Sequence, residues 1–170
     1  MELRPSPSTC SPPTSFGCPF EGKIDPKVVL KITERLLKLG CSDVSVGDTI
    51  GVANPAQVKK LTRSLLKLTG TKKLALHFHD TRGTALANIL AAMEEGVRTF
   101  DSSTAGIGGC PYAPGATGNV ATDDLLYMLD GMGVQTGINL DLQVQASSFV
   151  QRVLGRKLPS KYLQAALSRQ

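Results

Sequence analysis

The chain has 170 residues, of which 41% are hydrophobic, and this is enough for one domain with a packed core. Its net charge of +5 comes from 19 basic and 14 acidic residues, and the basic residues are scattered along predicted helices. That distribution is typical of solvated helix faces, and the few aromatic residues are not interleaved with the basic ones. Composition therefore argues against a nucleic-acid partner.

The cysteines lack the short paired spacing of a zinc ribbon, so a reducing compartment is the simplest interpretation; they are Cys10, Cys18, Cys41 and Cys110. No apolar run approaches the roughly 18 residues needed to span a bilayer, and no apolar signal-peptide core is found near the start. We expect no membrane partner and a cytoplasmic protein, with the mitochondrial matrix as the alternative for a eukaryotic source.

Residues 1–16 contain four prolines and four serines, a composition that cannot build a packed element. We expect this segment to be disordered or extended. The folded domain is expected to cover residues 17–170.

From Asp25 onward the chain becomes periodic. Helices are predicted by apolar stripes with N-caps and terminal glycines at about 26–39, 55–69, 84–95, 122–131, 140–154 and 160–168. Short apolar runs predict strands at 44–46, 73–79 and 97–101. Strands that alternate with such helices predict an α/β fold with right-handed βαβ units and a parallel sheet. A fourth strand before the first helix is disfavoured by the Pro/Ser composition there, so the pattern resembles half of an α/β barrel.

His77 and His79 are the only two histidines, and they end the strand at 73–79. Residues i and i+2 of a strand point to the same face, so the two imidazoles project together and offer two nitrogen ligands to a divalent metal. The alternative is a pair of partly buried histidines that are hydrogen-bonded to neighbouring groups.

Other polar groups also fall at predicted strand ends, where parallel α/β folds bind ligands. Asp48 follows the first strand, although an aspartate between two glycines commonly caps a turn. The glycine-rich loop at 105–119 carries Cys110, which is suited to proton transfer or nucleophilic attack, with an unreactive loop cysteine as the alternative. Asn119 ends this loop and offers a carbonyl oxygen to a cation, or else it caps the next helix.

Two imidazoles and one amide oxygen leave coordination positions unfilled. With a carboxylate and water added, such a set favours Mg²⁺ or Mn²⁺ over structural zinc. These positions suit Lewis-acid chemistry on a substrate carbonyl or hydroxyl.

Four motifs together resemble the hydroxymethylglutaryl-CoA lyase family, in its bacterial-type form. They are Gly-Cys-Pro-Phe-Glu-Gly at 17–22, Gly-Asp-Thr-Ile-Gly at 47–51, the His-Phe-His-Asp segment at 77–88 and the loop at 101–119. The Gly-Gly-Cys-Pro-Tyr-Ala sequence is the specific part, because related barrel enzymes that condense acetyl-CoA with 2-oxo acids share only the His-x-His.

The resemblance implies a (β/α)₈ (TIM) barrel, of which this chain would be about the C-terminal half. The implied activity is cleavage of 3-hydroxy-3-methylglutaryl-CoA to acetyl-CoA and acetoacetate, a reaction of leucine degradation and ketone body metabolism, with Mg²⁺ or Mn²⁺. By match to the family motifs, His77, His79 and Asn119 would be metal ligands. Cys110 would be the loop cysteine of catalysis, Asp48 an active-site acid, and His77 a further catalytic residue.

The family pattern begins with a strand that carries an Arg-Asp pair, and the sequence shows no such segment. The Asp would supply a metal ligand and the Arg would stabilise the enolate-like state. A half barrel would also have two unpaired sheet edges and an uncovered face. The alternatives to a lyase are a non-catalytic half barrel that pairs with another chain and another metal-dependent aldolase of this barrel group. The expected partners are an acyl-CoA substrate, together with the missing N-terminal half or a second copy of the chain.

Overall fold

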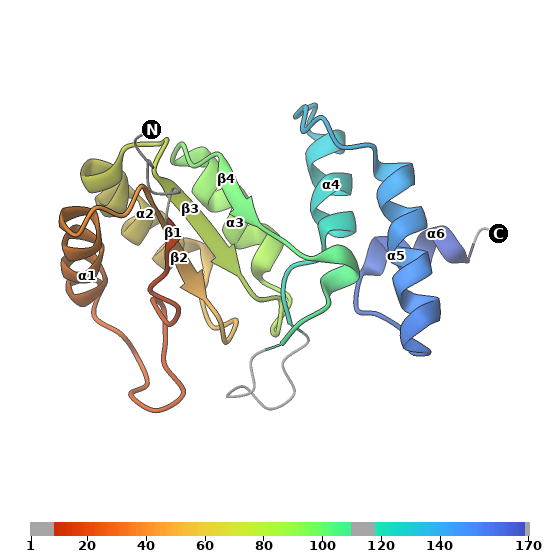
Figure 1. Cartoon of the computed structure of the whole chain (residues 1–170), viewed down its shortest axis with the longest axis horizontal. Helices are drawn as coiled ribbons and strands as arrows, with labels where there is room; N and C mark the ends of the chain where they lie inside the picture. Colours follow the sequence, from red (N-terminus) through yellow and green to blue (C-terminus); the bar gives the residue numbers. More distant parts are fainter. Residues whose placement is uncertain (1–8, 110–117, 169–170) are drawn as a thin grey trace, which may run out of the picture.

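The protein is described by a computed structural model that covers residues 9–109 and 118–168. Figure 1 shows a sheet flanked by helices, with a group of C-terminal helices beside it. The elements are, in chain order, β1 (Thr9–Cys10), α1 (Pro26–Lys38), β2 (Asp43–Asp48), α2 (Pro55–Thr69), β3 (Leu74–Phe78), α3 (Ala85–Glu94), β4 (Thr99–Asp101), the short 3₁₀ helix η1 (Thr104–Gly106), α4 (Thr122–Gly131), α5 (Leu140–Leu154) and α6 (Lys161–Leu167).

The sheet is parallel throughout and has the order β1-β2-β3-β4. In the register, Gly47 of β2 lies beside His77 of β3, and His77 lies beside Asp101 of β4. Within the described residues the sheet does not close on itself. This confirms the predicted partial barrel with strands and helices in alternation.

Predicted caps form at the starts of α1 and α2, whereas α3 and α4 begin without a side-chain capping bond. The Asp25 carboxylate accepts a hydrogen bond from the backbone N–H of Lys27, and Pro26 occupies the first turn of α1. Asn54 and Gln57 form a reciprocal capping box at the start of α2. These local signals explain why the sequence located the helices to within a few residues.

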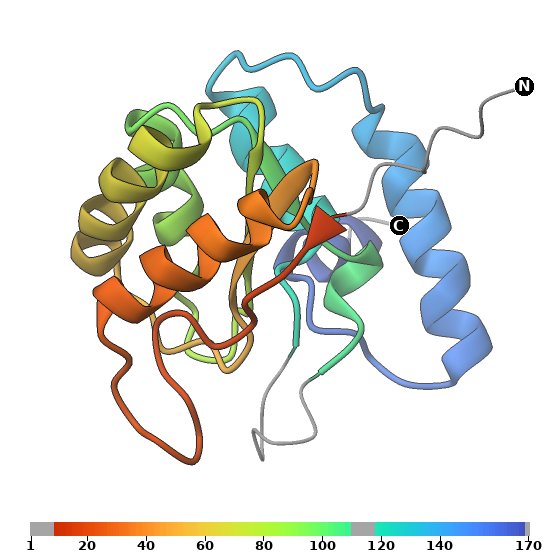
Figure 2. The same ribbon diagram turned by 60° about the vertical axis from the view of Figure 1, so that its left-hand side comes forward.

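The two faces of the sheet differ in chemistry. Leu74, Leu76 and Phe78 are buried against α1, α2 and α3, which stack on one side of the sheet in Figure 2. Alternation places Ala75 and His77 on the opposite face, which corresponds to the inside of a barrel. This inner face carries small and polar side chains, so it is the face available for a site.

Residues 9–16 follow the extended alternative, and they supply the fourth strand that the Pro/Ser composition disfavoured. Thr9 and Cys10 form β1, and the chain continues along the edge of β2, where the Gly47 N–H donates to the Pro12 carbonyl and the Ser15 N–H to the Gly47 carbonyl. Phe16 is buried in the main core. Prolines are tolerated here because an edge segment needs fewer N–H donors than a central strand. Residues 1–8 lie outside the described residues.

Cys10 and Cys41 form a disulfide that joins β1 to the connection between α1 and β2. The sequence spacing did not indicate this pair, and the expectation of reduced cysteines is not met for these two residues. Cys18 is a free thiol.

The C-terminal helices form a smaller second core around Ala105, Leu158 and Leu163. Pro159 separates α5 from α6, as predicted, and α5 spans the predicted 140–154. Among the described helices, none is long and apolar enough to cross a membrane.

Candidate metal centre and active site

His77 and His79 stand together at the carboxyl end of β3. Their ring centroids are 5.0 Å apart, with the rings in an edge-to-face arrangement. His79 is buried, whereas the exposed fraction of the His77 side chain is 24%. The predicted projection of the two imidazoles to one side is therefore present.

Asn119 is brought to this pair by the backbone. It forms a bridge with His79, and the flanking bonds run from the Asp80 N–H to the Gly118 carbonyl and from the Val120 N–H to the Phe78 carbonyl. The Asn119 amide nitrogen donates a hydrogen bond of 3.0 Å to the Ile107 carbonyl. This bond fixes the side-chain amide so that its oxygen points away from that carbonyl.

Two buried atoms of this group have no hydrogen-bond partner among the described residues. They are Nδ1 of His79 and Oδ1 of Asn119. A buried polar atom without a partner costs about 1–3 kcal/mol, so such atoms call for an explanation such as an ion. Both atoms are metal-ligand types, so the residues present fit a divalent cation.

Burial favours the neutral form of both imidazoles, which is the form that binds a metal. Burial, together with the charge of His77, lowers the pKa of His79 to about 4. Burial also lowers the pKa of His77, against the opposing influence of Asp101 and Asp48.

Asp101 lies on the inner face beside His77. Its Oδ2 is 3.8 Å from His77 Nδ1 and accepts a hydrogen bond of 2.8 Å from Ser45 Oγ. Asp101 ends the strand predicted at 97–101, and the carboxyl ends of strands converge in a barrel, so its position near the histidines was predictable, whereas Ser45 was missed. The available signal was the alternation in Val44-Ser45-Val46, which turns Ser45 to the inner face.

Asp48 is fully buried and holds the loop that follows β2. Its two carboxylate oxygens accept hydrogen bonds from the backbone N–H groups of Val52 and Ala53, at 3.0 and 2.9 Å. Burial raises the pKa of Asp48, while the two N–H donors, Arg82 and His77 lower it. These contacts fit the turn-capping alternative.

Cys110, the predicted catalytic cysteine, lies outside the described residues. Among the described residues, no three His, Cys, Asp or Glu side chains form a group that could hold a metal. The site within this part of the chain therefore consists of two imidazoles and one amide oxygen.

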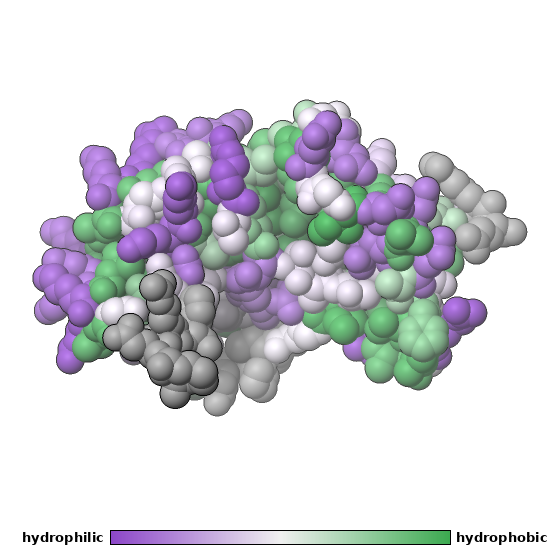
Figure 3. All heavy atoms as spheres, turned by 45° about the horizontal axis from the view of Figure 1, so that its top comes forward, coloured by the Kyte–Doolittle hydropathy of each residue, from purple (hydrophilic) through white to green (hydrophobic). Residues whose placement is uncertain are grey.

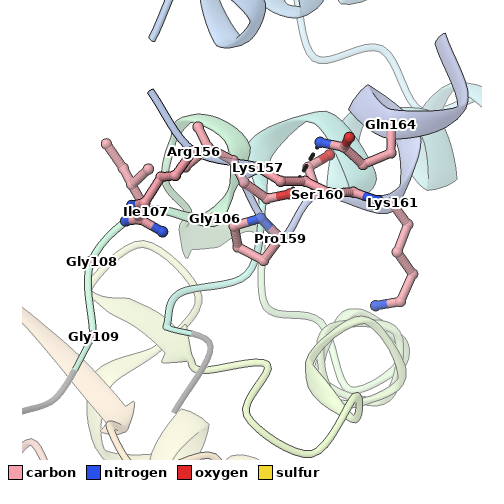
Figure 4. A pocket seen from close by; sticks show the side chains of 11 residues that line it. Gly106, Ile107, Gly108, Gly109, Arg156, Lys157, Pro159, Ser160, Lys161 and Gln164 are labelled. Carbon is pink, nitrogen blue, oxygen red and sulfur yellow. Dashed lines mark hydrogen bonds between the residues drawn. The ribbon is translucent and has the colours of Figure 1, made fainter. Parts of the chain in front are cut away.

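A cavity of about 830 Å³ lies close to this site, between the glycine-rich segment at 106–109 and the α5–α6 connection (Figure 4). Arg156, Lys157 and Lys161 line it. A smaller cavity of about 130 Å³ is lined by Asn119 and also by Lys161. Sequence reasoning did not select these three basic residues, because isolated charges in a C-terminal tail give no local signal.

An open parallel sheet with a His-x-His pair and an amide at its carboxyl edge defines a partial (β/α)₈ barrel with a candidate metal centre. The profile of the HMGL-like family matches residues 7–150. The chain belongs to the HMGL-like family.

The chain resembles hydroxymethylglutaryl-CoA lyases in both sequence and structure. The chain is 47% identical over 151 residues to hydroxymethylglutaryl-CoA lyase YngG of Bacillus subtilis, which covers 89% of this chain and 50% of that protein. It superimposes on hydroxymethylglutaryl-CoA lyase from Pseudomonas aeruginosa with a TM-score of 0.89 at 43% identity, covering 95% of this chain and 53% of the other. For an HMG-CoA lyase from Acinetobacter baumannii in complex with coenzyme A and 3-methylmalate, the TM-score is 0.87 at 46% identity, covering 92% and 51%. The chain thus spans about half the length of these relatives.

Proposed function

We propose that this chain provides the metal-binding half of a carbon–carbon lyase that cleaves 3-hydroxy-3-methylglutaryl-CoA to acetyl-CoA and acetoacetate. The observation that carries the proposal is the pair of partnerless buried atoms, His79 Nδ1 and Asn119 Oδ1, beside His77. Lyases of this name at 43–47% identity support the substrate.

His77, His79 and Asn119 would hold the ion, which we propose to be Mg²⁺ or Mn²⁺. Neutral imidazole and amide oxygen leave room for substrate oxygens and for a carboxylate from elsewhere in the barrel. When bound, the ion supplies polarisation of substrate oxygens and a lower pKa for the substrate hydroxyl.

The reaction would proceed in three steps. A base removes the proton from the 3-hydroxyl group, the bond between C2 and C3 breaks, and the electron pair forms the acetyl-CoA enolate. An acid then protonates C2, and acetoacetate is the other product. We propose Cys110 as the loop residue that takes part in proton transfer, with His77 as a second participant. We propose Asp48 as an active-site acid. Its hydrogen bonds to backbone N–H groups would also hold the loop at the edge of the site.

The basic cavity would take the coenzyme A part of the substrate. Arg156, Lys157 and Lys161 line a space that adjoins the small cavity at Asn119, and cationic side chains suit phosphate groups. The A. baumannii relative is a complex with coenzyme A, which supports a coenzyme A-containing ligand for the family.

The first test is Mn²⁺ binding by calorimetry on the full chain. We expect binding by the wild-type chain and by Gln145→Ala, a control at an exposed position on α5, and none by His77→Ala. Absence of binding by the wild-type chain would overturn the metal site.

The second test concerns catalysis. Acetoacetate would be measured with Mn²⁺ and substrate, for the chain alone and after co-expression with the half of the B. subtilis relative that this chain does not match. We expect product in the reconstituted sample and none above background when Cys110→Ala is used. A panel of other hydroxyacyl-CoA substrates distinguishes this lyase from another metal-dependent aldolase.

A non-catalytic half barrel that pairs with another chain is the second candidate. It is favoured by the open sheet and by exposed apolar side chains on α5, namely Leu142, Phe149 and Val153. Figure 3 shows a group of apolar residues on the side of the molecule that carries the C-terminal helices. A clean monomer in size-exclusion chromatography that binds no hydrophobic dye would contradict this candidate.

A further inference from the structure

One group of side chains on the inner face is not used by the proposed reaction. Ser45 of β2 and Asp101 of β4 belong to strands that are separated by β3, yet Ser45 Oγ donates a hydrogen bond of 2.8 Å to Asp101 Oδ2. In the register, Ala75 of β3 lies beside Ser45 and Thr99, and His77 lies beside Asp101. The hydrogen bond therefore crosses β3 diagonally, past the small methyl group of Ala75.

The same Asp101 oxygen faces His77. Asp101 Oδ2 lies 3.8 Å from His77 Nδ1, and the two residues are register partners on adjacent strands. At this separation the contact is electrostatic rather than a hydrogen bond. A carboxylate on the Nδ1 side favours the tautomer with its proton on Nδ1, because the N–H dipole then points at the negative charge. The lone pair is left on Nε2.

We propose that Ser45 and Asp101 form a positioning pair for the His77 imidazole, with Nδ1–H turned to the carboxylate and Nε2 left as the metal-binding nitrogen. Ser45 fixes the Asp101 carboxylate, and Asp101 fixes the tautomer and orientation of the ring. Metal-binding histidines commonly have such a carboxylate on their second nitrogen. The metal-binding part rests on the proposed function, whereas the tautomer of His77 in the metal-free chain does not.

The tautomer is measured by ¹⁵N spectroscopy of the imidazole nitrogens. The chain has two histidines, so His79 provides an internal control in every spectrum. In the wild-type chain we expect His77 to be protonated on Nδ1. In Asp101→Ala we expect a shift toward the tautomer protonated on Nε2, with the His79 signals unchanged. Asp101→Asn retains an acceptor oxygen and is expected to preserve most of the Nδ1–H tautomer.

Mn²⁺ affinity is the second measurement. We expect Asp101→Ala to weaken binding between about 10-fold and 100-fold, as for other residues that orient metal ligands, and Ser45→Ala to weaken it by less. Thr99→Ala, two residues away on the same exposed face of β4, is the matched control and is expected to bind as the wild-type chain does. Amide spectra of each variant confirm the fold.

The outcomes separate this inference from the proposed function. An unchanged His77 tautomer in Asp101→Ala overturns the positioning pair, whatever the metal affinity. A changed tautomer supports the orientation, and if Mn²⁺ fails to bind even the wild-type chain, the metal site fails while the orientation stands. Equal loss of affinity in Thr99→Ala would overturn a specific contribution of Asp101 to metal binding.

Discussion

His79 and Asn119 lie on neighbouring backbone segments, and each retains one buried side-chain atom without a partner among the described residues. The two residues are 40 positions apart in the sequence and are joined by the bonds that dock segment 118–120 onto the end of β3. A chain that leaves two such atoms unsatisfied accepts a cost of about 1–3 kcal/mol for each. A bound cation would satisfy both atoms, so we expect the metal-free chain to be less stable than the metal-bound chain.

Metal binding should stabilise the fold and require His77. At a Mn²⁺ concentration 100 times the dissociation constant, we expect the free energy of unfolding to rise by about 2.7 kcal/mol. The measurement is urea unfolding with and without Mn²⁺, with His77→Ala as the test variant. Stabilisation of equal size in His77→Ala would show that the metal binds elsewhere.

Stability of the metal-free chain should depend on His79 at acidic pH. The pKa of His79 is about 4 in the folded chain and has its ordinary value of 6.5 in the unfolded chain. Between these values the unfolded chain binds more protons, so the free energy of unfolding is highest above pH 6.5 and falls as the pH drops toward 4. The contribution of His79 is at most about 3 kcal/mol.

This pH effect is isolated by comparing urea unfolding of the wild-type chain and His79→Asn at pH 7 and pH 4.5, both without metal. Carboxylates titrate in both proteins, so they cancel in the comparison. We expect a smaller loss of stability in the variant, and parallel pH profiles would contradict the assignment.

Reduction of the Cys10–Cys41 disulfide should destabilise the attachment of β1. The bond closes a loop with a sequence separation of 31, for which the loss of chain entropy in the unfolded state corresponds to about 3–4 kcal/mol. Thermal unfolding with and without dithiothreitol measures this effect. Cys10→Ser should resemble the reduced chain and no longer respond to the reductant, whereas Cys18→Ser should respond as the wild-type chain does.

Gly47 should not tolerate a side chain. A Cβ atom at this position would lie 2.9 Å from the Pro13 carbonyl oxygen, which belongs to the backbone of the edge segment. We expect Gly47→Ala to cost about 1–3 kcal/mol and to expose residues 9–16 to proteolysis. Gly131→Ala is the control, because nothing lies within 4 Å of the added atom at this helical position. Equal stability of the two variants would mean that the edge segment does not pack on β2 as described.

Asp48 should stabilise the loop after β2 through both of its oxygens. Asp48→Asn has one acceptor oxygen, so it loses the bond to either Val52 or Ala53, and we expect a decrease of about 1–3 kcal/mol in the free energy of unfolding. The exposed Asp130→Asn is the control. Normal stability together with lost lyase activity in the reconstituted enzyme would instead support a role for Asp48 in proton transfer alone.

The local elements were determined by the sequence alone. Asp25, Asn54 and Asn139 cap helices with side chains that reach only two or three residues along the chain. The His-x-His pair was equally predictable, because a strand turns alternate side chains to one face whatever surrounds it. Short apolar runs also located β2, β3 and β4, and therefore the class of fold.

Tertiary structure decided everything that depends on contacts between distant segments. The Pro/Ser-rich segment at 9–16 has no strand pattern of its own and becomes an edge of the sheet because β2 offers it backbone partners. Cys10 meets Cys41 only because that edge is formed. The side-chain constellation of Ser45, His77 and Asp101 likewise depends on the register of three strands, which no local propensity specifies. Sequence therefore placed the two histidines on one face of a strand, and the fold supplied the groups that surround them.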